Sequence, residues 1–173
     1  MKPLFYLLMM TFSLPALAKK EVKADRFIIQ GQIFEIDIVS ETDKSAQNVQ
    51  IVVYQDKEVY ASFYSKDNGA YEFILPIGHE YELWFGGKEF VNKKVYVDTR
   101  SMPTKSSGYE CNLDMGLFKP IQNVEFPCLV DHYVKVRFDT EYKQLIPDYE
   151  YSQFKAKEVE KAVRKAKKTA GGY

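Results

Sequence analysis

The chain has 173 residues, and its 24 lysines and arginines balance its 24 aspartates and glutamates. This balance excludes a generally basic nucleic-acid-binding protein, and a hydrophobic content of 46% excludes a disordered chain. Two cysteines are too few for a disulfide-rich scaffold, whereas 13 tyrosines and 12 phenylalanines are typical of sheet-forming proteins.

The first 18 residues have the pattern of a cleavable secretory signal peptide. Lys2 is followed by an apolar run that ends in Ala16-Leu17-Ala18, an A-x-A cleavage site. The run is too short to cross a bilayer easily, and the alternative is an uncleaved anchor or a buried helix. We therefore expect a mature chain, residues 19–173, without a transmembrane segment. It would be exported to the periplasm or the outer membrane, or outside the cell.

Removal of the signal peptide divides the charge unevenly along the chain. Residues 19–151 contain 16 basic and 22 acidic side chains, a net charge of −6, whereas residues 152–173 contain seven basic and two acidic ones, a net charge of +5. The sequence thus predicts an acidic body joined near Tyr151 to a basic tail.

Alternating apolar and polar residues predict a series of short strands from residue 26 onward. Polar turns such as Lys66-Asp67-Asn68-Gly69 separate them. The predicted strands are 26–39, 48–55, 58–65, 70–75, 80–85, 93–98, 109–118 and 132–139. This spacing predicts an all-β fold, an antiparallel β-sandwich over residues 19–142.

Helical periodicity begins only after the predicted sandwich. Residues 143–173 are expected to form a linker and a basic helix whose apolar side chains share one face: Phe154, Val159, Ala162, Val163 and Ala166. We expect this helix to be solvated. The alternatives are a contact with an acidic partner, with anionic lipid or with the acidic body itself.

Several segments, taken in order, carry a resemblance to a known family. Gly31-Gln32-Ile33 opens the first strand, residues 46–54 form the next, and residues 64–73 form a hairpin that turns at Gly69. Residues 75–83 and 91–99 complete the series. The set, over residues 27–99, resembles the carboxypeptidase regulatory-like domain, a transthyretin-like (prealbumin-like) β-sandwich. The resemblance implies a stand-alone, exported cell-envelope protein of Gram-negative bacteria.

No residue spacing points to a catalytic or metal site. His79 and His132 stand apart, without an HExxH motif or paired CxxC motifs, and Asp67-Asn68-Gly69 fits a turn better than a calcium loop. We therefore expect no cofactor, no metal and no catalytic residues. The sequence predicts that the chain is not an enzyme.

Cys111 and Cys128 form the one candidate covalent pair. An even number of cysteines in an exported chain favours a disulfide, which would close a loop of about 17 residues and contribute about 3 kcal/mol. Two buried free thiols are the first alternative, and a cysteine nucleophile that uses His132 is the second.

These features together predict a non-catalytic envelope module that mediates protein–protein interaction or has a structural or accessory role. The expected partner is another envelope protein, and no nucleic acid is expected. The alternative is a module that binds carbohydrate or another small ligand. The aromatic residues that we expect to form the contact are Trp84, Tyr142, Tyr149 and Tyr151.

Overall fold

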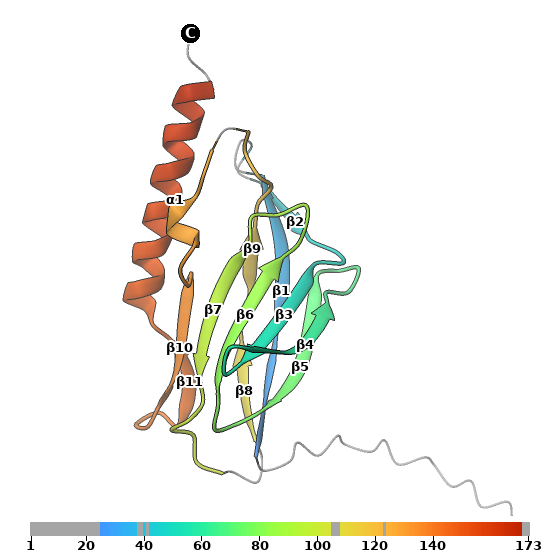
Figure 1. Ribbon diagram of the computed structural model, residues 1–173, viewed down its shortest axis with the longest axis vertical. Coiled ribbons are helices and arrows are strands. Elements are labelled where there is room, and N and C mark those ends of the chain that lie inside the picture. Colours follow the sequence, from blue (N-terminus) through green and yellow to red (C-terminus); the bar gives the residue numbers. More distant parts are fainter. Residues whose placement is uncertain (1–24, 38–39, 41, 105–107, 123, 171–173) are drawn as a thin grey trace, which may run out of the picture.

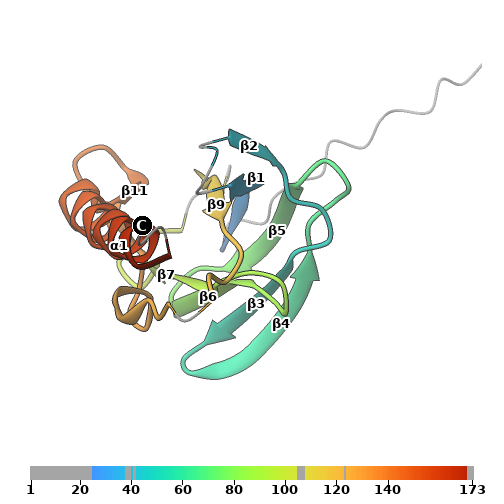
Figure 2. The ribbon, with the colours of Figure 1, turned by 90° about the horizontal axis from the view of Figure 1, so that it is seen from above.

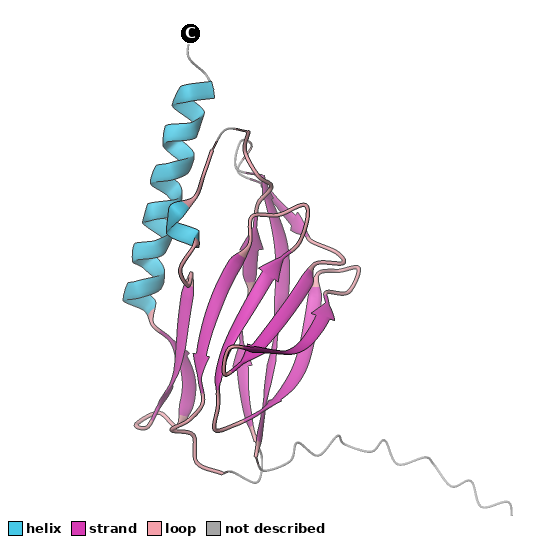
Figure 3. Ribbon diagram, viewed as in Figure 1, coloured by secondary structure: helices cyan, strands magenta, loops and turns pink. Residues whose placement is uncertain are grey.

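Two packed β-sheets and one long helix beside them make up the described part of the chain (Figure 1, Figure 3). The computed structural model describes residues 25–37, 40, 42–104, 108–122 and 124–170. The expected signal peptide, residues 1–18, lies outside this part. None of the helices in the described ranges is long and apolar enough to cross a membrane.

One sheet has six strands in the order β11-β10-β7-β6-β3-β4. Neighbouring strands are antiparallel except β7 and β10, which run parallel. The strands are β3 (Gln50–Gln55), β4 (Glu58–Tyr64), β6 (Glu80–Gly86), β7 (Lys93–Asp98), β10 (Val134–Asp139) and β11 (Gln144–Pro147). Strand β4 therefore lies at one edge of this sheet.

The other sheet is organised around its first strand. Strand β1 (Arg26–Asp37) pairs antiparallel with β5 (Ala70–Pro76) and β2 (Thr42–Ser45), and parallel with β8 (Tyr109–Asn112) and β9 (Met115–Leu117). Every other strand of this sheet thus depends on β1 for its register.

The core lies between the two sheets, which Figure 2 shows edge-on as two layers. Alternate residues of the strands point inward, and Ile29, Ile51 and Leu83 are completely buried. Phe63 and Phe73 stack across the layers with their ring centroids 4.7 Å apart. Burying an aliphatic or aromatic side chain of this size contributes about 1.5–3 kcal/mol, so this interior holds the sheets together.

A helix follows the last strand and packs against the sandwich. Helix α1 (Tyr149–Ala170) begins after Asp148, whose carboxylate accepts the N–H of Tyr151 at 3.0 Å and caps the helix. One face of α1 contributes to a second apolar cluster, separate from the sandwich core. The buried members of this cluster are Phe118, Phe126, Leu129 and Val163, beside the short 3₁₀ helix η1 (Pro127–Leu129). The helix that we expected to be solvated is therefore packed on the body along one face.

The β-sandwich fold class is confirmed, and all eight predicted strand segments contain strands. Residues 109–118 form two strands rather than one, and β2 and β11 were not predicted. All four residues of β2 are exposed and show no alternation, and β11 has only four residues. The boundary expected at residue 142 falls within the β10–β11 hairpin, so the sheet extends to Pro147.

Candidate functional site

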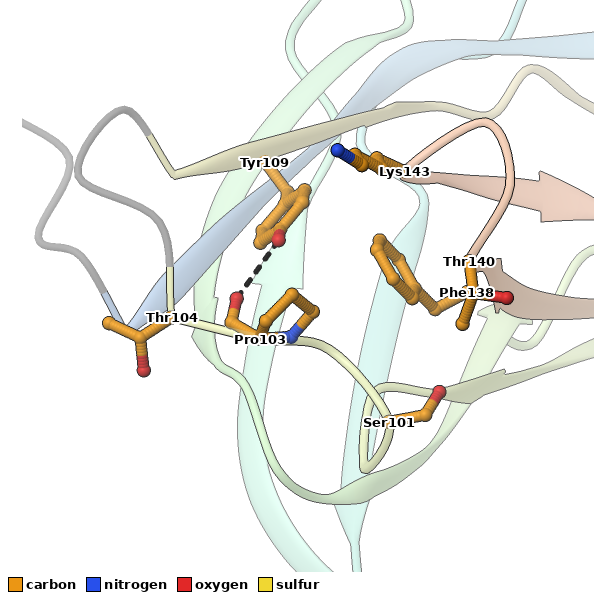
Figure 4. A pocket seen from close by; sticks show the side chains of 7 residues that line it. All are labelled: Ser101, Pro103, Thr104, Tyr109, Phe138, Thr140 and Lys143. Atoms are coloured by element: carbon orange, nitrogen blue, oxygen red, sulfur yellow. Dashed lines mark hydrogen bonds between the residues drawn. The ribbon is translucent and has the colours of Figure 1, made fainter.

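A cavity of about 410 Å³ opens where the loop after β7 meets the β10–β11 hairpin (Figure 4). Its lining combines two aromatic rings, a proline, three hydroxyl side chains and one lysine. These residues are Ser101, Pro103, Thr104, Tyr109, Phe138, Thr140 and Lys143. No aspartate or glutamate lines the cavity among the described residues. It is therefore an apolar hollow with a polar, cationic rim.

The floor of this cavity is held in place by its own contacts. Tyr109 and Phe138 form an edge-to-face pair with ring centroids 5.4 Å apart, and both are at most 8% exposed. The Tyr109 hydroxyl donates to the Pro103 carbonyl at 2.9 Å, as Figure 4 shows. Lys143 lies at the rim, exposed, in the left-handed backbone region with a φ of 53°. No local pattern in the sequence predicted this site, because its residues come from three separate segments.

Trp84 lies on the outer face of the six-stranded sheet. Its ring centroid is 5.1 Å from that of Tyr54, and the Nζ atom of Lys94 lies 4.4 Å from the indole centroid. The indole N–H donates to the carboxylate of Glu82. Because Lys94 covers one face of the ring, a sugar that stacked on that face would have to displace the lysine.

The fold brings His132 next to carboxylates from different parts of the chain. Its Nε2 atom lies 2.6 Å from Glu82 and its Nδ1 atom 3.2 Å from Asp131. A hydrogen bond from the His132 backbone is the largest contribution that lowers the pKa of Asp131. Within the ranges that the structure describes, no group of three or more histidine, cysteine or acidic side chains could hold a metal ion.

The three predicted contact tyrosines have different environments. Tyr151 joins the helix to the body, with its hydroxyl 3.0 Å from the Asp131 carboxylate and 2.7 Å from the His132 carbonyl. Tyr142 in the β10–β11 turn and Tyr149 at the start of α1 are 67% and 68% exposed. Tyr151 therefore holds the fold together, whereas the other two present their rings to solvent.

The structure does not join Cys111 and Cys128 by the predicted disulfide: both cysteines are free. Cys111 of β8 is buried in the sandwich core, whereas Cys128 of η1 packs beside the second apolar cluster. Burial raises the pKa of Cys111 to about 11 and also raises that of Cys128. An even count of thiols could not reveal that the fold places them in separate clusters.

Two lysines are buried near helix α1. Lys93 is only 4% exposed, and its Nζ atom lies 4.1 Å from the ring centroid of Tyr133. Burial lowers the pKa of Lys93 to about 8. Lys155 of α1 donates to the Cys128 carbonyl at 3.3 Å and lies 3.3 Å from Glu158. The hydrogen bond from Lys155 to Cys128 thus attaches the basic tail to the body.

The edge strand β4 carries large apolar side chains in solvent. Val59, Tyr60 and Tyr64 are 65%, 47% and 59% exposed. The Ser65 N–H donates to the Val49 carbonyl, and hydrogen bonding alternates along an antiparallel ladder. The N–H of Ser62 therefore points away from β3, towards the open edge. The alternating pattern predicted this strand, but only the strand order shows that it is an edge.

Comparisons with known proteins find likeness in structure alone. No family model matches the chain, and no curated protein matches it. Among solved structures, 3-chlorocatechol 1,2-dioxygenase from Rhodococcus opacus is 8% identical over 59% of this chain, with a TM-score of 0.40. The Bacillus anthracis TIE protein is 15% identical over 55%, with a TM-score of 0.40. The minor pilin GBS52 of Streptococcus agalactiae is 12% identical over 58%, with a TM-score of 0.39.

The chain spans 62% of the length of the dioxygenase, 17% of the TIE protein and 48% of the pilin. The prediction that the chain is not an enzyme is contradicted, because catechol and hydroxyquinol 1,2-dioxygenases are among the matched structures. That exclusion relied on local motifs, which cannot show residues that the fold brings together, such as Glu82 and His132. At these identities and TM-scores, the matches transfer no activity, substrate or partner to this chain.

Proposed function

We propose that this β-sandwich is an interaction module of the cell envelope that binds an extended segment of another protein at the open edge of β4. The single observation that carries the proposal is this edge. Strand β4 is the last strand in the order of the six-stranded sheet, and it exposes three large apolar side chains.

The chemistry of an open strand edge selects the kind of partner. Outward N–H and C=O groups are satisfied by another extended backbone, and neighbouring side chains then supply selectivity. Proteins commonly protect such edges with lysine, proline or a bulge. Strand β4 contains neither lysine nor proline, and its one charged residue is Glu58 at the beginning. A bulge does occur, near Val53 and Tyr54 of the paired strand β3, but Ser62 and Tyr64 lie beyond it.

Two features of the sequence support a location in the cell envelope for this module. The signal pattern of residues 1–18 favours export to the periplasm or the outer membrane. The resemblance of residues 27–99 to the carboxypeptidase regulatory-like domain favours a stand-alone envelope protein. The expected partner is therefore another envelope protein.

Cross-linking from β4 would test the proposal. A photoreactive residue at Ser62 should link to a protein partner in cells, and the same residue at Asp67 in the next turn should do so much less. The linked partner is then purified, and its affinity for the chain is measured. Cross-links only between two copies of this chain would contradict the proposal.

A matched pair of substitutions tests whether the edge itself binds. Val59→Lys places a charge in the edge and should weaken binding about tenfold or more, the effect of roughly 1.4 kcal/mol. Val130→Lys changes a valine that is 73% exposed on another surface, and it should leave the affinity unchanged. Equal losses for the two variants would refute binding at β4.

A further inference from the structure

The cavity beside the β10–β11 hairpin has the size of a small-molecule site. Its volume of about 410 Å³ lies within the range of roughly 300–1,000 Å³ that is typical of ligand pockets. A single aromatic ring with a short substituent fits such a space. This cavity is separate from the edge of β4, so a ligand could bind there whether or not β4 binds a protein partner.

The floor of the cavity is suited to an apolar ring. Tyr109 and Phe138 present aromatic surface, and Figure 4 shows both rings directed towards the space between the loop and the hairpin. The Tyr109 hydroxyl is already bonded to the Pro103 carbonyl, which fixes the orientation of the ring. A floor that is ordered in advance loses little conformational entropy when a ligand binds.

The rim of the cavity is suited to an anion. Lys143 forms no ion pair with any residue in the described part of the chain, and the lining there contains no carboxylate. The carboxylate of nearby Asp139 accepts the N–H groups of Glu141 and Tyr142, at 2.8 and 2.9 Å. The hydroxyls of Ser101 and Thr140 can donate to a bound anion. Among the described lining residues, a cationic ligand would find no opposite charge.

We propose that this cavity binds a small aromatic carboxylate. Its ring packs on Tyr109 and Phe138, and its carboxylate pairs with Lys143. The same two groups occur in a free aromatic acid and at the end of a peptide whose last residue is phenylalanine or tyrosine.

Titration with benzoate, followed by two-dimensional ¹H–¹⁵N NMR of the purified protein, would test this site. Benzoate should shift the amide resonances of Ser101, Tyr109, Phe138 and Thr140. Benzyl alcohol, which lacks the charge, should bind more weakly at the same residues. N-acetylphenylalanine distinguishes the two sources, because only a site that accepts a peptide end accommodates its additional amide. The free acid is indicated if benzoate alone binds, and the peptide end if N-acetylphenylalanine binds more tightly.

A matched pair of lysines tests the role of charge. Lys143→Gln should weaken benzoate binding about threefold or more, the effect of a partly exposed charge pair, and should leave benzyl alcohol binding unchanged. Lys57 provides the control, because it is also exposed in a hairpin turn, with a φ of 74°. Lys57→Gln should leave both affinities unchanged. The proposal is overturned if benzoate shifts none of the four resonances up to about 20 mM, well above a millimolar dissociation constant. Equal losses in the two variants would also overturn it.

Discussion

Three glycines allow two kinds of backbone constraint to be measured separately. A Cβ atom at Gly31 would lie 2.2 Å from the Leu113 carbonyl oxygen, at the point where β8 ends. Gly78 has a φ of +91° and, in the described structure, no atom outside residues 77–79 lies within 4 Å of such a Cβ. Gly69 combines both constraints, with a φ of +79° and the Ile33 carbonyl oxygen only 2.4 Å away. Substitution by alanine at each position therefore tests a steric clash, a backbone strain and their sum.

The expected losses follow from these geometries. Positive φ costs alanine about 1–2 kcal/mol, and the reduced entropy of the unfolded chain offsets about 0.4–1 kcal/mol. Gly78→Ala should therefore lower the free energy of unfolding by about 1 kcal/mol. Gly31→Ala forces a backbone oxygen to move and should lower it by about 1–3 kcal/mol, as overpacking does. Gly69→Ala should lower it by about 2–4 kcal/mol, because both effects act there.

Urea unfolding followed by far-UV circular dichroism would measure the three losses. The urea midpoint should be highest for Gly78→Ala, lower for Gly31→Ala and lowest for Gly69→Ala. The slope of the unfolding free energy against urea concentration should stay unchanged. A Gly31→Ala protein as stable as the wild type would show that the Leu113 carbonyl moves aside freely. A loss for Gly69→Ala no greater than that for Gly78→Ala would refute the contribution of the Ile33 contact.

Three further predictions concern the helix and the buried groups. Tyr151→Phe removes the hydroxyl beside Asp131 and should destabilise the protein by about 1 kcal/mol, with faster hydrogen exchange in α1; unchanged exchange there would contradict the anchoring role. Cys128 should react with a thiol reagent in the native protein while the buried Cys111 reacts only on unfolding, and a mass lower by two hydrogens without reductant would instead reveal a disulfide. Lys93 has a pKa of about 8 when folded against 10.5 when unfolded, so the unfolded chain binds more protons between these values and stability should rise from pH 8 towards pH 10. Lys93→Met should remove this rise, and an identical pH profile for both proteins would refute it.

The sequence was most informative where one side of a strand is buried. Alternation located strands such as β3 and β6, because Ile51 and Leu83 must face the interior while their neighbours need not. The helix was predicted for a similar reason, since its apolar residues repeat at helical spacing. The polar strand β2 buries nothing, so no pattern distinguished it from a loop.

The candidate sites were harder to predict from the sequence, because they depend on pairing between distant segments. The cavity combines Pro103, Tyr109 and Phe138, and it depends on β8 packing against the β10–β11 hairpin. Likewise, the contact of His132 with Glu82 joins residues 50 positions apart. Conversely, residues near one another in the sequence can be separated by the fold. Cys111 and Cys128 are 17 positions apart and occupy different apolar clusters.

The central position of β1 has a consequence for the order of events during folding. Gln32 of this first strand donates to Asp114, 82 residues further along the chain, so the sheet around β1 stays incomplete until that segment has been synthesised. Pairing across such distances slows folding, because a large loop must close before the contacts form. During that interval the parts of β1 that later pair with β8 and β9 remain open to other chains. If the first 18 residues direct export, as their pattern predicts, such a delay would keep the chain unfolded for that passage.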